Sequence, residues 1–217
     1  MNPPSFLSLN AWAAHERLCL RLLEAALRKF PVVDPDEGED ALNRRLYFHI
    51  TETGRDIERA EGVTLPVVVP EGLNPPLATD EERAAREHKR PDFYWAYHDH
   101  DGREFARQFV VECKRLTLPS RSWVYSEQYV VAGVRRFAST EHGYGAQAWA
   151  GAMVAYLQNL QADEALAQVN QYLGVTGLPE LPPGTDSAGT RRLAHKFSRP
   201  FDHSPFSLFH IWRLPDA

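Results

Sequence analysis

Apolar residues near the start of the chain recur at steps of three and four. Between Asn10 and Phe30 they lie on one face of a helix, at Trp12, Cys19, Leu22, Leu23, Ala26 and Phe30. Pro31 follows at once, and its ring cannot continue the hydrogen-bond ladder of a helix. The spacing therefore predicts an amphipathic helix over 10–30 that ends at Pro31.

The same spacing returns after the acidic turn at 34–40, with Leu42, Leu46 and Ile50 in step. These residues predict a second helix, and acidic side chains in its first turn suit the helix dipole. Residues 51–90 mix Pro, Gly and charge, so we expect an insertion or flexible excursion there, with a short strand at 67–69.

The middle of the chain has the pattern of a β-hairpin. Two segments, 93–97 and 105–116, are rich in aromatic and branched residues. Asp101-Gly102 between them is a strong hairpin turn signal. We expect two antiparallel strands here.

Further elements follow in alternation. The pattern predicts a helix at 125–137, a buried strand at 149–157, a helix at 163–173 stopped by Gly174, a Pro/Gly loop at 174–190, and closing strands at 193–197 and 206–214. A chain of 217 residues favours one domain. We therefore expect a single α/β (α+β) domain over 1–217, in which helices flank a mixed central sheet.

Composition narrows the class of protein. The net charge of −5 argues against indiscriminate binding to phosphates, so any contact with DNA has to be local. No apolar run reaches the roughly 20 residues that span a bilayer, and the N-terminus lacks a secretory signal, so no membrane association is expected. Two cysteines, Cys19 and Cys113, cannot form a disulfide framework, which is typical of a cytoplasmic protein.

The candidate chemistry lies in the hairpin. Side chains alternate along a strand, so Glu112 and Lys114 share one face of a strongly apolar segment, where unpaired charge is costly. If the turn at 101–103 closes the hairpin, paired residue numbers sum to about 204, which sets Asp92 opposite Glu112. Two opposed carboxylates need a neutralising partner, and Mg²⁺ is the natural candidate.

Pro91-Asp92 followed by Glu112-Cys113-Lys114 on a hairpin resembles the PD-(D/E)xK nuclease superfamily, whose fold is restriction-endonuclease-like. That superfamily orders its core as helix, three strands, helix, strand, and 39–173 is similar to it. The later segments 129–137 and 151–156 resemble uncharacterised bacterial relatives associated with restriction or antiphage defence.

The resemblance implies roles for particular residues. Asp92 and Glu112 would ligate Mg²⁺, or Mn²⁺, with the Cys113 backbone carbonyl as a further ligand and Lys114 beside the attacking water. Relatives often add an acid from the preceding helix. Glu39 is the preferred match and Glu16 the alternative.

Structural explanations compete with these roles. Asp92, Glu112 and Lys114 could form a structural ion pair, and Glu39 could simply cap its helix. The His98–Asp101 run could bind a transition metal, although a solvated hairpin tip explains it better. Of Arg135 and Arg136, at most one would reach nucleic acid, because adjacent helical residues point in different directions.

The resulting prediction is an Mg²⁺-dependent endonuclease, a phosphodiester hydrolase acting on DNA in bacterial defence. A second hypothesis is a nuclease-fold subunit without turnover that binds nucleic acid or serves in assembly. A homodimer or a larger defence complex is compatible with both, as are DNA and RNA substrates and either strand preference.

Overall fold

The sheet that organises the molecule contains seven strands. The computed structural model describes residues 6–31, 33–74, 85–97, 107–119, 123–201 and 203–215. The strand order is β1-β2-β3-β4-β7-β6-β5. Their bounds are β1 Val68–Pro70, β2 Phe93–Tyr97, β3 Arg107–Thr117, β4 Ala150–Gln158, β5 Thr185–Ser187, β6 Thr190–Phe197 and β7 Phe206–Arg213. The expected mixed α/β class and single domain are confirmed.

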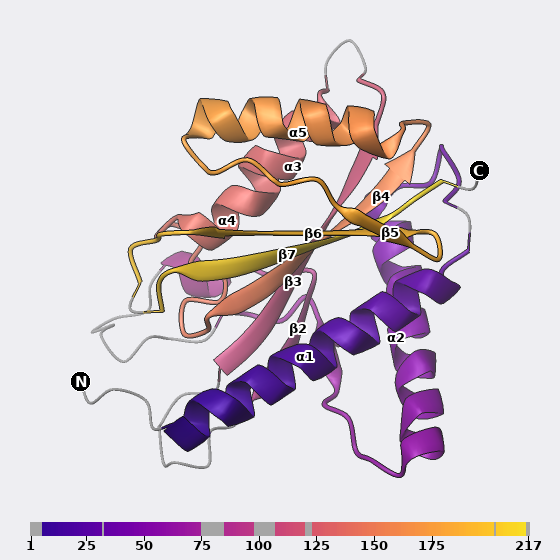
Figure 1. Ribbon diagram of the computed structural model, residues 1–217, viewed down its shortest axis with the longest axis vertical. Coiled ribbons are helices and arrows are strands. Elements are labelled where there is room, and N and C mark those ends of the chain that lie inside the picture. The colour runs from indigo at the N-terminus through magenta and orange to yellow at the C-terminus, as the bar shows by residue number, and fades with distance from the viewer. Residues whose placement is uncertain are drawn as a thin grey trace.

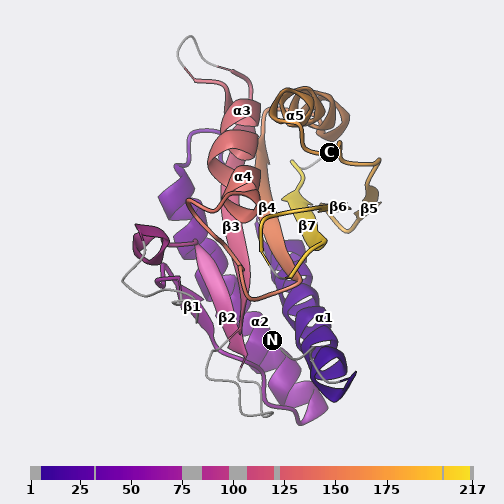
Figure 2. The same cartoon turned by 90° about the vertical axis from the view of Figure 1, so that its left-hand side faces the viewer.

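Helices cover both faces of this sheet (Figures 1 and 2). On one side lie α1 (Phe6–Lys29) and α2 (Glu39–Glu61). On the other side lie α5 (Ala162–Thr176) and a continuous helix made of α3 (Tyr125–Tyr129), the π-helical η2 (Val130–Val134) and α4 (Arg135–Ala138). A short 3₁₀ turn, η1, spans Ala85–His88. The sheet therefore has a separate apolar core on each face.

The first two helices form where the apolar spacing predicts them. Leu42, Leu46 and Ile50 are all buried on α2. However, α2 continues to Glu61 and ends at Gly62, which adopts the left-handed conformation. The expectation of an irregular excursion from residue 51 onward is therefore wrong for 51–61, whereas the short strand expected at 67–69 is present as β1.

Strand pairing in the hairpin follows the predicted register. Phe93 pairs with Val111 in the antiparallel β2–β3 ladder, so the residue numbers sum to 204 and Asp92 lies one step from this pair, next to Glu112. The hairpin tip at 98–106 lies outside the described residues. Both faces of β3 are buried, since Val110 joins the core under α3 and α4 while Val111 joins the core under α1 and α2.

Parallel strands occupy the centre of the sheet. β3 pairs in parallel with β4, and β4 with β7. Every residue of β4 is buried, as expected for a central strand covered on both faces. Gly151 is required there, because a Cβ atom at this position would lie 2.8 Å from the Phe137 ring and 3.0 Å from the Val110 carbonyl oxygen.

The last third of the chain completes the far edge. α5 runs past Gly174 to Thr176 and ends at Gly177, which has φ of +73°, so the predicted stop was three residues early. The expected loop at 174–190 includes the short strand β5, and the closing strands form as predicted. No helix within the described residues is long and apolar enough to cross a bilayer.

Candidate active site

The fold brings the four predicted side chains to one place. Asp92 precedes β2, Glu112 and Lys114 lie on β3, and Glu39 opens α2. The Lys114 Nζ atom lies 2.8 Å from Glu39 Oε1 and 2.9 Å from Glu112 Oε1. Glu39 and Glu112, which lie far apart in the chain, thus share one ammonium group.

Asp92 is held in a fixed orientation by three elements. Its Oδ2 accepts a hydrogen bond from the Cys113 backbone N–H at 2.6 Å, and its Oδ1 accepts one from Asn43 Nδ2 at 3.0 Å. The Tyr156 hydroxyl on β4 donates to Asn43 Oδ1 at 3.0 Å. Because α2, β3 and β4 all contribute, the carboxylate is oriented before any ligand arrives.

Glu112 is the most deeply buried member, with 1% of its side chain exposed. Its Oε1 accepts from both Lys114 and Arg136, whereas Oε2 is buried and has no hydrogen-bond partner among the described residues. An orphaned carboxylate oxygen in such a place is costly. Oε2 is therefore the oxygen of Glu112 that is open to a further partner.

Arg136 belongs to this cluster through its helix. Its guanidinium contacts Glu112 and lies 3.5 Å from the Tyr144 hydroxyl, while the neighbouring Arg135 is exposed. The π-helical turn just before α4 accommodates an extra residue and so fixes which side of α4 faces β3. The expectation that the two arginines diverge agrees with this arrangement.

Burial raises the pKa values of the two acids Asp92 and Glu112, and the neighbouring charges modify this effect. Burial raises the pKa of Asp92 to about 6, against the opposing effect of Lys114. Burial, reinforced by the charge of Asp92, raises the pKa of Glu112 to about 8. Burial by itself would lower the pKa of Lys114, but Glu112, Asp92 and Glu39 together raise it above its ordinary value. The site thus holds a permanent ammonium beside carboxyls that resist ionisation.

The oxygen atoms present fit a hard divalent cation. Asp92, the orphaned Oε2 of Glu112 and the Cys113 carbonyl are all oxygen donors, the type that Mg²⁺ prefers. Burial raises the pKa of the Cys113 thiol, so the sulfur stays neutral and only the backbone oxygen is suited to this role. Within the described part of the chain no group of three His, Cys, Asp or Glu side chains could hold a metal, so two carboxylates would have to suffice.

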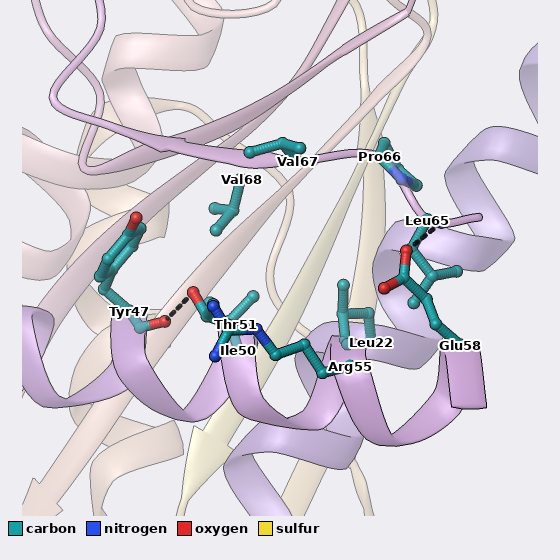
Figure 3. A pocket seen from close by; sticks show the side chains of 11 residues that line it. Leu22, Tyr47, Ile50, Thr51, Arg55, Glu58, Leu65, Pro66, Val67 and Val68 are labelled. Carbon is teal, nitrogen blue, oxygen red and sulfur yellow. Dashed lines mark hydrogen bonds between the residues drawn. The ribbon is translucent and has the colours of Figure 1, made fainter. Parts of the chain in front are cut away.

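A pocket of about 420 Å³ opens beside the cluster. We call it the cationic pocket; it is lined by Glu39, Lys114 and Arg136 from the cluster and, next to them, by Arg115, Trp123 and Tyr125. A second groove, of about 350 Å³, lies between α2 and the segment 65–68 (Figure 3). It shares no lining residue with the cluster, and we assign it no role.

Other predicted positions lie elsewhere or outside the described residues. Glu16 interacts electrostatically with Arg17, Arg192 and Lys196, so α1 does not bring it to the cluster. Glu39 is the acid that the fold places there. The His98–Asp101 run falls within 98–106 and is not described.

The sequence matches no family model, and neither a curated protein nor a solved structure matches it. What the site can do therefore has to be inferred from its own geometry.

Asn43 escaped prediction from the sequence. It lies four residues after Glu39 on α2, and this spacing puts both on one helix face, so the signal was present. Arg136 was expected only as a possible contact to nucleic acid, and its ion pair with Glu112 follows from the packing of its helix.

Proposed function

We propose that the protein is a metal-dependent nuclease that hydrolyses phosphodiester bonds of DNA. The observation that carries this proposal is the pair of carboxyls on half-buried Asp92 and fully buried Glu112 beside the Lys114 ammonium. Two coupled carboxyls with raised pKa values can release their protons when a divalent cation binds in place of those protons. A purely structural ion pair has no need of a second carboxyl and an orphaned oxygen.

The chain order supports membership of the PD-(D/E)xK superfamily. α2 is followed by β1, β2 and β3, then by the α3–α4 helix and β4, which is the order helix, three strands, helix, strand. The first three strands are antiparallel and β4 is parallel to β3. We propose a restriction-endonuclease-like core on this basis.

Each side chain has a proposed task. Asp92, Glu112 and the Cys113 carbonyl would hold Mg²⁺ or Mn²⁺, which when bound would supply Lewis-acid polarisation of the phosphate and an acidified water. Lys114 would orient the attacking water and stabilise charge that develops on the phosphate oxygens. Glu39 keeps the Lys114 ammonium in place through its 2.8 Å contact. Arg136 balances the charge of Glu112.

The net charge of the protein bears on how it would contact a nucleic acid. With a net charge of −5, the protein is suited to local contacts near the cluster rather than to broad phosphate binding. Arg115 and Arg136 line the cationic pocket next to Lys114 and supply such contacts. We propose a role in bacterial restriction or antiphage defence, in the cytoplasm, where the buried thiols of Cys19 and Cys113 stay reduced.

The proposal is tested by incubating plasmid, linear and single-stranded DNA with Mg²⁺ or Mn²⁺. Wild type should cleave, whereas Asp92→Ala and Lys114→Ala should not. Asp56→Ala and Lys29→Ala are matched controls, because they remove an exposed acid and an exposed amine that pair at 3.0 Å far from the cluster. Equal cleavage by wild type and the site variants would reject the assignment.

One observation favours a second function. Both Lys114 and Arg136 already occupy Oε1 of Glu112, and the described residues supply only two carboxylates for a metal. A nuclease-fold module that binds nucleic acid without turnover would have these features. A wild type that binds DNA but cleaves none of the substrates with either metal would select this function.

A further inference from the structure

The cationic pocket combines features that the cluster itself does not use. Trp123 has 49% of its surface exposed, and its ring meets Tyr125 edge-on with centroids 6.5 Å apart. An exposed indole ring beside a half-buried phenol ring, both lining a charged pocket, is unusual on a protein surface, since large aromatics dominate cores and binding sites. They offer a flat apolar surface beside the catalytic amine.

Arg115 supplies a positive charge next to these rings. Its guanidinium lies over the Tyr125 ring at 5.2 Å from the centroid and donates to the Glu37 carbonyl at 3.2 Å. Within the described ranges no carboxylate forms an ion pair with this guanidinium, in contrast to Lys114 and Arg136. The charge is held in place by neutral partners and remains available to an anion.

The size and position of the pocket define what fits. A volume of about 420 Å³ lies in the range of small-ligand pockets, about 300–1,000 Å³. A base inside a duplex has both faces covered by neighbours, so only an unpaired base can stack on an aromatic side chain. Gln128 on the wall offers a donor and an acceptor for a base edge.

We propose that the cationic pocket binds one unstacked nucleotide of single-stranded DNA, with its base against Trp123 and a phosphate against Arg115. The proposal rests on the proposed function in that the bound nucleotide flanks the phosphate to be cleaved beside Lys114. The substrate class is then single-stranded DNA, or a duplex with an unpaired end, rather than a fully paired duplex.

Affinity can be measured without hydrolysis. Fluorescence anisotropy in EDTA would compare a labelled oligothymidine with a blunt hairpin duplex of equal nucleotide count. Trp123→Ala should weaken oligothymidine binding by about fivefold to hundredfold, as for loss of one stacked base, and change duplex binding by less than about twofold. Trp123→Phe should restore most of the affinity. Arg115→Gln should lower the salt dependence, reducing the slope of log K against log salt by about 0.7, the value for one phosphate contact.

α2 offers a matched control pair. Arg44 lies over the Phe48 ring at 5.2 Å, and Phe48 is 53% exposed, so Phe48→Ala and Arg44→Gln remove an equivalent surface pair away from the pocket. Equal losses for the control and pocket variants would overturn the proposal. So would unchanged oligothymidine affinity in Trp123→Ala.

The two proposals can fail separately. If Asp92→Ala abolishes cleavage while Trp123→Ala leaves oligothymidine binding intact, the pocket assignment is wrong and the nuclease stands. If Trp123 governs binding but no metal supports cleavage, the nuclease is wrong and the pocket stands.

Discussion

Replacing Glu112 by Gln tests the electrostatics of the cluster directly. The amide keeps the shape of the side chain and can still accept hydrogen bonds from Lys114 and Arg136 at Oε1. It removes only the charge, which burial disfavours. We therefore expect Glu112→Gln to be more stable than wild type in EDTA at alkaline pH.

The sign and the magnitude follow from the raised pKa. Between the unfolded pKa of 4.5 and the folded value of about 8, the folded protein binds more protons at Glu112 than the unfolded chain does. The stability of the wild type therefore falls as pH rises through this window and levels off above it. At about 1.4 kcal/mol for each tenfold change in proton affinity, the upper limit of the loss is about 5 kcal/mol. Gln cannot ionise and escapes this loss.

Urea unfolding between about pH 5 and pH 9 measures how the free energies of unfolding of wild type and Glu112→Gln differ, because the contributions of the other titrating groups are largely the same in the two proteins. The difference in free energy of unfolding between Glu112→Gln and wild type should be small near pH 5 and should increase toward pH 8. Saturating Mg²⁺ should narrow this difference: at a hundred times the Kd, the wild type gains about 2.7 kcal/mol, and the variant gains little.

The opposite ranking in EDTA would refute the reasoning. If Glu112→Gln is the less stable protein at alkaline pH, the ion pairs with Lys114 and Arg136 outweigh the cost of burial. The cluster would then be a structural ion pair, and the orphaned Oε2 of Glu112 would no longer support a metal site.

Four further substitutions probe the site and the fold. Lys114→Met should lower cleavage by about a hundredfold to a thousandfold, as for loss of one charge-stabilising group, without weakening DNA affinity measured in EDTA; equal loss of both would place the residue in binding alone. Gly151→Ala should destabilise the fold by about 1–3 kcal/mol in urea unfolding, because its Cβ would lie 2.8 Å from the Phe137 ring. Gly174→Ala should stabilise the fold by up to about 1 kcal/mol in the same titration, because Gly174 lies inside α5 and a Cβ there meets nothing within 4 Å. Leu46→Ala, on the buried face of α2, should cost about 2–5 kcal/mol by calorimetry, and a loss under about 1 kcal/mol would show that this face is not packed.

Periodicity predicted where elements begin better than where they end. α2 was recognised from Leu42, Leu46 and Ile50, but the next buried positions are Thr53 and Gly54, which carry no apolar signal. The second half of the helix was therefore missed. Similarly, β5 is fully exposed, so no hydrophobic pattern could reveal it.

The site was predictable where it depended on local geometry. Strand alternation and the turn signal were enough to pair Asp92 with Glu112, because both lie on one hairpin. Tertiary packing supplied the rest. Arg136 is brought to Glu112 by the helix that follows β3 in the chain, and the cationic pocket is lined by three separate stretches of chain, at residue 39, at 114–115 and at 123–136. No spacing rule links these stretches to one another.

The position of β7 has a consequence for synthesis on the ribosome. It follows the other six strands in the chain, yet it lies between β4 and β6. Until it emerges, one edge of β4 has no partner, although all nine residues of that strand are buried in the finished fold. While residues 159–213 are being translated, the nascent chain therefore carries an open, apolar strand edge, which is the kind of surface that chaperones cover and that aggregates when they do not.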